Sequence, residues 1–426
     1  MQVQNSVRSV VRSQSTRRET CRVCGSRRLS LILDLGISPL ANRFLRSEQL
    51  NQDEPTFPLD VFVCADCSLV QLLEVVDPEL LFRDYVYVSG TSETMRAHFA
   101  RFAEALIQRF AFPPDALVVE VASNDGTFLG NFAGRGLRLI GVEPAVNIAE
   151  IARRRGIESI TEFFSEDVAE RLRAEHGPAA CVLATNVFAH LDDVNGFVRG
   201  LDRLLDAEGI FVLENSYVRD MLEQLEFDSV YHEHLSYFSV TALSALFSRH
   251  GMEIFDVQHH EVHGGSLRVL VKRQGASHPT TGAPARFIDG ERRAGLCDLA
   301  AYEAFASRVY ALRSTLVEML TGLRAQGKRI AAYGSAAKGN TLLNFLGIGS
   351  GLVSYLVDKN PMKQGLFSPG MHLPVYPAER LLEDRPDYAL VLAWNFTDEI
   401  VRQQRAYVEA GGRFIVPIPV PTIIPQ

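Results

Sequence analysis

Four cysteines near the amino terminus form two Cys-x-x-Cys pairs, Cys21 with Cys24 and Cys64 with Cys67. Each pair spans one tight turn that can direct two thiolates at the same ion, and two such turns supply the closed four-sulfur shell typical of structural zinc. Because no coordination position stays open, this zinc would fold its segment rather than do chemistry. Redox-active pairs and a nucleic-acid-binding zinc ribbon are the alternatives. The few arginines after Cys24 give no basic surplus, which argues against the nucleic-acid-binding ribbon.

The densest polar cluster is the run Tyr-His-Glu-His at residues 231–234. Histidine titrates near neutral pH and can serve as a general base. An apolar run at 210–213 and a helical stretch at 218–227 precede the cluster, so we expect it on a loop at the carboxyl edge of a sheet. A solvated loop, or a metal site in which His232 and His234 share one face, would also fit.

Two other polar groups could reach the same edge. His190 ends the run Asn-Val-Phe-Ala-His that follows an apolar segment at 181–184, although it could also cap a helix. The run Asp-Tyr-Val-Tyr-Val-Ser at residues 84–89 lies between the cysteines and the sheet, and its alternation would equally fit a half-buried strand.

The elements that must position these groups begin near residue 116. Short apolar runs alternate with helical patterns, which predicts a doubly wound parallel sheet that binds ligands beyond the carboxyl ends of its strands. The expected strands are 117–121, 137–142, 181–184 and 210–213.

The turn after the first of these strands reads Ser-Asn-Asp-Gly, at residues 123–126. A dinucleotide needs a glycine-rich turn whose backbone amides meet the pyrophosphate. This turn has one glycine and places a carboxylate where a phosphate would lie. It suits S-adenosylmethionine, which has no phosphate and carries an ammonium and a sulfonium group, and Glu143 is spaced to accept hydrogen bonds from its ribose. Another adenosine ligand is the alternative.

A second unit of the same kind follows a helical linker at 294–326. We expect strands at 329–333 and 353–357, joined through the turn Gly-Ser-Ala-Ala-Lys-Gly-Asn at 334–340. Backbone amides at a helix start together with Lys338 suit a diphosphate, and Lys363 would add charge on the same side. A purely structural unit is the alternative.

Bulk properties limit the function classes. A length of 426 residues favours two or three domains, and 47% hydrophobic with 22% charged residues is ordinary for a globular protein. The net charge of −8 argues against nucleic acid as a partner, and no apolar run reaches the roughly eighteen residues of a membrane span. The Arg-rich start lacks a secretory signal, so we expect a disordered tail over residues 1–18 and a cytoplasmic protein, with mitochondrial targeting as the alternative.

From Cys21 to about Pro417 the chain resembles the sugar C-methyltransferases that act on nucleotide-linked 4-keto-deoxysugars in antibiotic biosynthesis. The matching motifs are the paired Cys-x-x-Cys, Tyr-x-Tyr-x-Ser at 85–89, Ser-Asn-Asp-Gly, Asn-Val-x-Ala-His at 186–190, Tyr-His-Glu-His, and Gly-x-x-Ala-Lys-Gly-Asn. Ala122 departs from the pattern, because many methyltransferases have glycine there.

The resemblance implies an α/β protein of three domains: a zinc-binding module over 19–75, a doubly wound Rossmann-like methyltransferase domain over 76–290, and a helical linker with a second Rossmann-like domain over 291–426. It implies S-adenosylmethionine as methyl donor, S-adenosylhomocysteine as product, and a deoxythymidine diphosphate sugar as substrate. It implies methylation most often at C3, with C5 as the alternative. We expect a monomer, with an oligomer left open.

The resemblance also assigns roles to residues. His234 is the base, Glu233 and Tyr231 position the sugar or the imidazole, and Tyr85 and His190 hydrogen-bond the ketone oxygen. The residues expected to border the cofactor are Tyr87, Ser89, Glu120, Ser123, Asn124, Asp125, Gly126, Glu143, Pro144 and Asn186. The residues expected to hold the nucleotide are Gly334, Ser335, Lys338, Asn340 and Lys363. An enolising epimerase and a nicotinamide-dependent oxidoreductase of a nucleotide sugar are the alternatives, and a zinc scaffold without activity is more distant.

Overall fold

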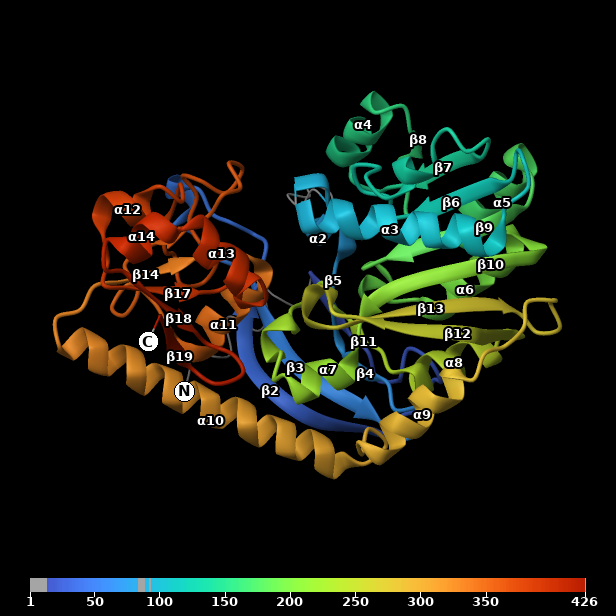
Figure 1. Ribbon diagram of the computed structural model, residues 1–426. Coiled ribbons are helices and arrows are strands. Elements are labelled where there is room, and N and C mark those ends of the chain that lie inside the picture. Colours follow the sequence, from blue (N-terminus) through green and yellow to red (C-terminus); the bar gives the residue numbers. More distant parts are fainter. Residues whose placement is uncertain (1–13, 83–88, 92, 426) are drawn as a thin grey trace.

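The computed structural model describes residues 14–82, 89–91 and 93–425. Figure 1 shows two α/β lobes side by side, with strands of the N-terminal segment between and beneath them and one long helix along the base of the second lobe and of these strands. The expected α/β architecture with two parallel sheets is confirmed. Tyr85 and Tyr87 lie outside the described residues.

The larger lobe is built on a seven-stranded sheet in the order β12-β13-β10-β9-β6-β7-β8. Its strands are β6 (Leu117–Val121), β7 (Arg138–Val142), β8 (Glu158–Ile160), β9 (Ala179–Thr185), β10 (Leu205–Ser216), β12 (Met252–His260) and β13 (Ser266–Arg273). The five strands from β8 to β10 run parallel, whereas β13 pairs antiparallel with both β10 and β12. All four strands expected in this region are present.

Helices cover both faces of this sheet, as a doubly wound fold requires. They are α3 (Glu93–Phe110), α4 (Val146–Arg154), α5 (Glu166–His176), α6 (Val194–Leu204), α8 (Val240–Ser248) and α9 (Ala283–Arg293). Helix α7 (Val218–Glu223) instead packs in the core that contains the N-terminal sheet. The neighbouring residues Val118 and Val119 point into separate cores, because successive side chains of a strand face opposite sides. Val118 packs with α3, and Val119 packs with α5, α6 and α8.

The N-terminal segment forms its own small sheets. Its elements are β1 (Ser15–Arg17), β2 (Leu29–Pro39), β3 (Thr56–Cys64), β4 (Val70–Leu72), β5 (Glu74–Val76) and α2 (Pro78–Phe82). The main sheet has the order β11-β4-β3-β2, and β11 (Ser236–Tyr237) comes from the larger lobe. The expectation of a disordered tail to residue 18 is wrong for residues 15–17, because these pair antiparallel with β5.

The second lobe has a six-stranded sheet in the order β16-β15-β14-β17-β18-β19. Its elements are β14 (Ile330–Tyr333), β15 (Leu356–Val357), β16 (Val375–Tyr376), β17 (Tyr388–Val391), β18 (Arg413–Val416), β19 (Thr422–Ile424), α11 (Ala337–Leu346), α12 (Arg380–Asp384), α13 (Thr397–Gln403) and α14 (Arg405–Glu409). The expected linker contains α10 (Leu299–Ala325), the long helix at the base of Figure 1. The strand expected at 353–357 is shorter, at Leu356–Val357.

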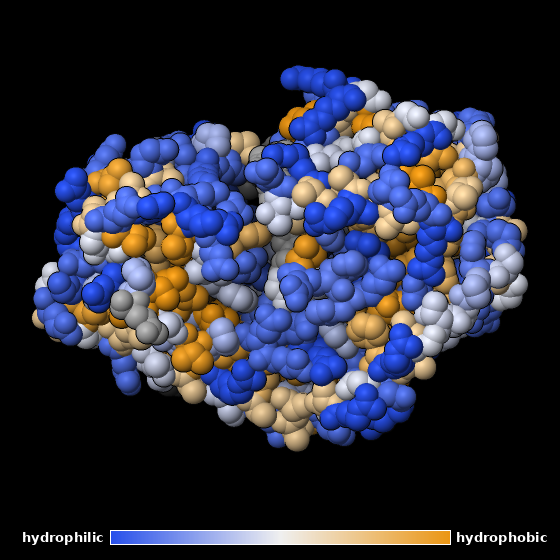
Figure 2. Space-filling view, in the orientation of Figure 1, coloured by the Kyte–Doolittle hydropathy of each residue, from blue (hydrophilic) through white to orange (hydrophobic). Residues whose placement is uncertain are grey.

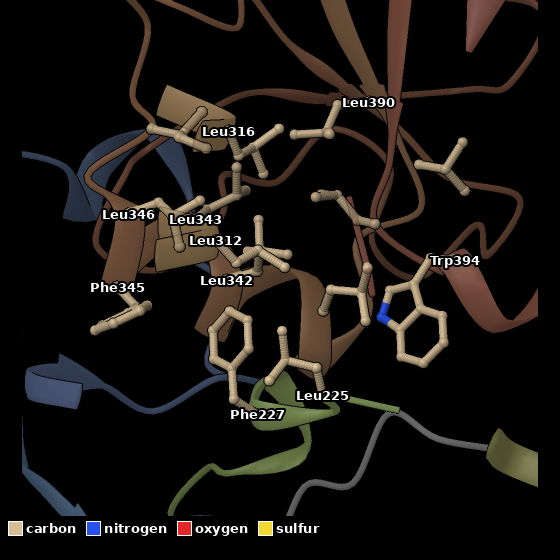
Figure 3. Close-up of a cluster of buried hydrophobic side chains, with 14 of the residues drawn as sticks. Leu225, Phe227, Leu312, Leu316, Leu342, Leu343, Phe345, Leu346, Leu390 and Trp394 are labelled. Carbon is tan, nitrogen blue, oxygen red and sulfur yellow. The ribbon is translucent and has the colours of Figure 1, made fainter. Parts of the chain in front are cut away.

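Short 3-10 turns complete the described chain, at Ser47–Gln49, Ser89–Thr91, Leu129–Phe132, Phe188–His190, Phe227–Ser229, Val262–Gly264 and Trp394–Phe396. The turn at Phe227–Ser229 belongs to the larger lobe in sequence but packs into the second lobe. Figure 3 shows Leu225 and Phe227 directed into a cluster of leucines from α10 and α11. None of the helices in the described part of the chain is both long and apolar enough to cross a membrane.

Candidate active site and zinc-binding cluster

One cavity of about 950 Å³ extends from the carboxyl ends of β6, β7 and β9 to the turn after β14 in the second lobe. Figure 2 shows the surface hollowed between the two lobes. Most of the residues that the sequence assigned to three separate roles line this one cavity, namely Ser89, Glu120, Ser123, Asn124, Glu143, Pro144, Asn186, His190, Tyr231, His234, Gly334, Lys338 and Lys363. The volume is ample for a cofactor and a substrate together.

Strained backbone surrounds the end of the cavity formed by β6 and β9. Ala122, Asn124 and Asn186 all adopt left-handed conformations, with φ of 53°, 49° and 54°. Residues other than glycine enter this region at a cost, and such strain gathers at binding sites. The conformation at Ala122 explains why glycine would be favoured at this position. The left-handed conformations at Ala122 and Asn124 turn the 123–126 segment sharply across the end of the sheet.

Glu143, at the end of β7, holds this turn in place. The backbone N–H of Asn124 donates to Oε2 at 2.9 Å, and that of Ala145 donates to Oε1 at 2.8 Å. Burial raises the pKa of Glu143. Each oxygen keeps a second lone pair, so a carboxylate that lines the cavity can still accept from ribose hydroxyls.

Glu120 and Ser123 line the same end of the cavity. Burial, with Asp125 and Glu143 nearby, raises the pKa of Glu120 well above its usual value, and its Oε2 accepts from the N–H of Leu129 at 3.1 Å. The buried hydroxyl of Ser123 has no hydrogen-bond partner among the described residues.

Asp125 and Gly126 do not line the cavity, contrary to expectation. The Asp125 side chain is fully buried behind the wall, and its Oδ2 pairs with Arg155 at 2.7 Å. The same oxygen accepts from the N–H of Gly90 at 3.2 Å, while Asn124 Oδ1 accepts from the N–H of Ser89 at 2.9 Å. The left-handed turn directs the Asp125 side chain away from the cavity. Its carboxylate holds the backbone of the 89–91 segment through the hydrogen bond from Gly90.

His234 is held between two hydrogen bonds. Its Nδ1 lies 2.8 Å from the carbonyl oxygen of Ser229, which can only accept, so Nδ1 carries the proton and donates. The neutral ring then has a lone pair on Nε2, which accepts from the hydroxyl of Tyr231 at 2.8 Å. The two rings are in contact, with centroids 4.0 Å apart. This arrangement fixes one tautomer and directs its basic nitrogen to Tyr231.

The ring of His190 lies beside that of His234, with centroids 5.0 Å apart. Burial lowers the pKa of His190 to about 4. Burial and then the neighbouring His190 lower the pKa of His234 well below its usual value. Both imidazoles are therefore neutral near neutral pH, and the expectation that they meet at the sheet edge holds geometrically.

The other two members of the 231–234 run are not among the residues that line the cavity. Glu233 is buried, and its Oε1 accepts from Asn42 Nδ2 at 2.7 Å, which ties the motif to the N-terminal segment. His232 is also buried, and its Nε2 lies 3.3 Å from the carbonyl oxygen of Pro58. A metal site shared by His232 and His234 is therefore wrong. Among the described residues, only the cysteine cluster brings three or more suitable ligands together.

The four cysteines converge as expected. Their Sγ atoms all lie within 4.8 Å of one another, with Cys21 to Cys67 and Cys24 to Cys64 each at 3.5 Å. The residue after each pair is left-handed, Gly25 with φ of 76° and Ser68 with φ of 59°, which closes two equivalent turns. Four soft thiolates at this spacing fit tetrahedral zinc, whose bonds to sulfur are about 2.3 Å.

In the second lobe, Lys338 and Lys363 line the cavity, and the ammonium group of each already has a partner within the protein. Lys338 Nζ pairs with Glu226 Oε2 at 3.2 Å and lies over the Trp394 ring, 5.4 Å from its centroid. Lys363 Nζ donates to the carbonyl oxygen of Ser335 at 2.8 Å, and burial lowers its pKa.

Two residues expected to hold the nucleotide have structural partners instead. The N–H and hydroxyl of Ser335 both donate to Asp358 Oδ2, at 2.7 and 2.9 Å. Asn340 Nδ2 donates to the carbonyl oxygen of Ala41 at 2.7 Å, which ties α11 to the N-terminal segment. Neither residue lines the cavity, because both side chains are turned into the fold. Their assignment to the nucleotide site stays a prediction.

The sequence reasoning missed three residues beside His234. Asn215, Ser236 and Tyr237 line the cavity, and Asn215 Oδ1, Ser236 Oγ and Tyr237 Oη are buried without a hydrogen-bond partner among the described residues. Ser236 and Tyr237 directly follow the Tyr-His-Glu-His-Leu run, and that adjacency was the available signal. Asn215 offered no comparable signal.

Comparison with protein families assigns three consecutive segments. Residues 21–82 match a family described as "Putative zinc binding domain", residues 95–257 match "Methyltransferase domain", and residues 261–419 match "C-methyltransferase C-terminal domain". The chain is 37% identical over 406 residues to C-methyltransferase NovU of Streptomyces niveus, covering 95% of this chain and 97% of that protein.

Solved structures with partial similarity include a SAM-dependent methyltransferase from Anabaena variabilis, at 18% identity and a TM-score of 0.33. The match covers 42% of this chain and 86% of that one. Magnesium protoporphyrin IX methyltransferase from Synechocystis with bound SAH matches at 12% identity and a TM-score of 0.34, covering 42% and 83%.

Proposed function

This chain belongs to the C-methyltransferase family, and from this premise we propose that it methylates the carbon next to the ketone of a nucleotide-linked 4-keto-deoxysugar. S-adenosylmethionine is the methyl donor of its methyltransferase domain, and the cysteine cluster is its zinc site. Within the proposal, the substrate is a deoxythymidine diphosphate sugar, and the methylated carbon is C3. We further propose that the protein works in the cytoplasm as a monomer.

The observation that carries the proposal is the environment of His234. Its Nε2 is unprotonated, and the ring lines a cavity that reaches both the cofactor turn and the lysines of the second lobe. Abstraction of a proton next to a ketone needs a neutral base at the meeting point of cofactor and sugar. His234 lines the cavity between the cofactor turn and the second lobe, with the His190 ring beside it, which supports its proposed role as that base.

In the proposed reaction, His234 Nε2 takes the proton from the carbon next to the ketone while Nδ1–H keeps its hydrogen bond to Ser229. The hydroxyl of Tyr231, which donates to Nε2, turns to the sugar. Charge moves onto the ketone oxygen, where His190 donates an N–H hydrogen bond, with Tyr85 as second donor by resemblance. The enolate carbon then takes the sulfonium methyl that bound S-adenosylmethionine supplies.

The low pKa that burial and His190 give His234 makes it a weak base by itself. A bound diphosphate and a developing enolate are negative, and nearby negative charge raises the pKa of an imidazole. Substrate binding therefore strengthens the base when it is needed. Without that negative charge the pKa of His234 stays low, which opposes proton abstraction before the nucleotide is in place.

The proposed nucleotide site uses Lys338, Lys363 and the backbone at Gly334. Because Lys338 is paired with Glu226, the diphosphate would compete for its ammonium group. A charge-assisted contact to phosphate is stronger than a neutral one, which supports such an exchange. Lys363 would give up its contact to the Ser335 carbonyl in the same way.

The experiment that tests the proposal incubates the protein with a dTDP-4-keto-6-deoxysugar in deuterium oxide, with and without S-adenosylmethionine, and follows the sugar by mass spectrometry. We expect the mass of one methyl group to be added only with the cofactor, and the position of the label to name the carbon. Deuterium exchange without any methylation would favour the epimerase alternative. A response to NADH in a spectroscopic titration would favour the oxidoreductase, and no change in the sugar would overturn the proposed substrate.

A further inference from the structure

Arg22 lies between two of the zinc cysteines, Cys21 and Cys24, and its side chain is completely buried. A buried guanidinium is stabilised by pairing its charge and by hydrogen bonds to its donors, because desolvation is costly. The partners of Arg22 lie outside the zinc cluster, on the two segments that carry His190 and His234 and on the N-terminal sheet, while its Nη2 has no partner among the described residues.

The first partner is Asp192, two residues after His190. Arg22 Nε donates to Asp192 Oδ1 at 3.0 Å. Asp192 lines the cavity together with His190, so this ion pair attaches the His190 segment to the zinc turn. Arg18 donates to the same oxygen at 3.0 Å, but its side chain is more exposed than that of Arg22.

The second partner is the backbone after His234. Arg22 Nη1 donates to the carbonyl oxygen of Leu235 at 3.2 Å, and also to that of Leu72. The N–H of Leu72 donates to the same Leu235 oxygen at 3.0 Å. The segment then continues as β11, which pairs with β4 of the N-terminal sheet. The end of the His234 motif is thus part of the zinc-bearing sheet.

The backbone of Arg22 is itself fixed on both sides. Its N–H donates to Gln71 Oε1 at 3.1 Å, and its carbonyl oxygen accepts from Asn195 Nδ2 at 2.6 Å. With zinc bound to Cys21 and Cys24, this backbone would be rigid. A planar guanidinium that starts from a rigid backbone can hold two chain segments at a fixed separation, which an ammonium on a flexible stem cannot do.

We propose that Arg22 is a positioning residue through which the zinc cluster sets the separation of His190 and His234. Zinc then does more than fold its own module, because it holds the arginine that joins both histidine segments. The catalytic consequence rests on the proposed function, whereas the structural consequence, a fixed His234 ring, does not.

The test compares Arg22→Lys with the wild-type protein, and with Arg28→Lys as matched control. Arg28 lies in the same module, but its side chain is 73% exposed and pairs only with Asp66 on the surface. For R22K we expect unchanged zinc content and unchanged affinity for S-adenosylmethionine by calorimetry. We expect kcat to fall about 10²-fold, the loss that a displacement of about 1 Å causes, while R28K behaves as wild type.

A second readout needs no sugar substrate. In protein labelled with ¹⁵N-histidine, NMR distinguishes the Nδ1-protonated form of His234 from a mixture of tautomers. We expect a single Nδ1-protonated state in wild type and R28K, and averaged signals in R22K. Wild-type histidine signals and kcat in R22K would overturn the proposal. If the wild type methylates no sugar, the NMR result still decides the role of Arg22, so the two failures are distinguishable.

If R22K loses zinc, Asp192→Asn tests the same connection from its other end without touching the module. We expect D192N to keep its zinc and to lose the fixed His190–His234 arrangement in part, with a smaller decrease in kcat than R22K. Unaltered histidine signals and kcat in D192N would overturn the proposal.

Discussion

The hydroxyl oxygen of Tyr231 lies 2.8 Å from Nε2 of His234 and occupies the lone pair that a base would use. Because Nδ1 is held by the Ser229 carbonyl, the ring cannot change tautomer without breaking a second hydrogen bond. This arrangement keeps the basic nitrogen of His234 covered by one hydroxyl. A substrate that engages Tyr231 would uncover it.

We expect His234→Asn to abolish turnover while the affinity for S-adenosylmethionine stays nearly intact. Loss of a general base costs about 10²–10⁴-fold in rate, whereas the cofactor turn is formed by other strands. The amide of asparagine has an N–H that can still serve the Ser229 carbonyl, so the fold should persist. Steady-state kinetics and calorimetry measure the two effects. Unchanged activity would remove His234 from the role of base.

The pH dependence should report the low pKa of His234. Activity needs the neutral ring, so it is present above the pKa and lost as the pH falls through it. Burial lowers that pKa well below 6.5 in the free enzyme, so the acid limb of kcat/KM should lie below pH 6.5. Bound diphosphate raises the pKa, so the acid limb of kcat should lie at higher pH than that of kcat/KM. Coincident limbs would contradict this reasoning.

The same depressed pKa values affect stability. A histidine that is buried in its neutral form takes up a proton more readily in the unfolded chain, which favours unfolding at low pH. The contribution of these neutral histidines to the free energy of unfolding is fully present above the pKa of about 6.5 that a histidine has in the unfolded chain. It is lost as the pH falls from there toward the folded-state pKa, which is about 4 for His190. Thermal unfolding between pH 7 and pH 5 should show this decrease, and His190→Asn should reduce it.

Local patterns predicted the elements that depend on neighbours in sequence. Strand β6 reads as an apolar run interrupted only by Glu120 because it is buried on both faces, and the two cysteine turns are set by residues three apart. The same patterns could not show that residues 236–237 complete the zinc-bearing sheet. That pairing joins segments about 165 residues apart and depends on tertiary packing, not on propensity.

Side-chain direction was the other limit. The Ser-Asn-Asp-Gly letters do not reveal that left-handed φ values at Ala122 and Asn124 direct Asp125 outward to Arg155. Nor do the letters around residue 340 show that Asn340 reaches Ala41. Composition of a turn predicted the ligand class, but which of its side chains face that ligand depends on backbone conformation.

Trp394→Phe should weaken the anchor between the lobes. Trp394 Nε1 donates to Asp228 Oδ2 at 2.7 Å, and Asp228 is completely buried next to Ser229, whose carbonyl holds His234. Figure 3 shows Trp394 at the edge of the cluster that also receives Phe227. Leaving a buried acceptor unpaired costs about 1–3 kcal/mol, so we expect a lower Tm and a lower kcat.

Asp228→Asn is the matched control, because asparagine keeps an acceptor for the indole N–H. Burial raises the pKa of Asp228 to about 6, so the wild-type carboxyl disfavours the folded state as the pH rises from about 4 through 6. D228N should lack this dependence and retain most of kcat. If W394F kept both its Tm and its kcat, the anchor would have no part in positioning His234.

Cys64→Ser should produce a protein that binds no zinc and is unstable or insoluble. Cys64 ends β3, so loss of its thiolate opens the four-sulfur shell and loosens the sheet that contains β4 and β11. A segment of this size has little core of its own and depends on metal for its fold. Because β11 follows His234 directly, we expect the active site to fail together with the module.

The matched control is Cys297→Ser, which removes an exposed cysteine outside the cluster and should leave zinc content and Tm unchanged. Metal analysis and thermal unfolding of both variants make the comparison. A stable and active C64S protein without metal would refute the structural role of zinc. A C64S protein that keeps its fold but loses turnover would instead indicate that the metal acts by positioning the two histidines. Arg22 would transmit this effect through its contacts to their two segments.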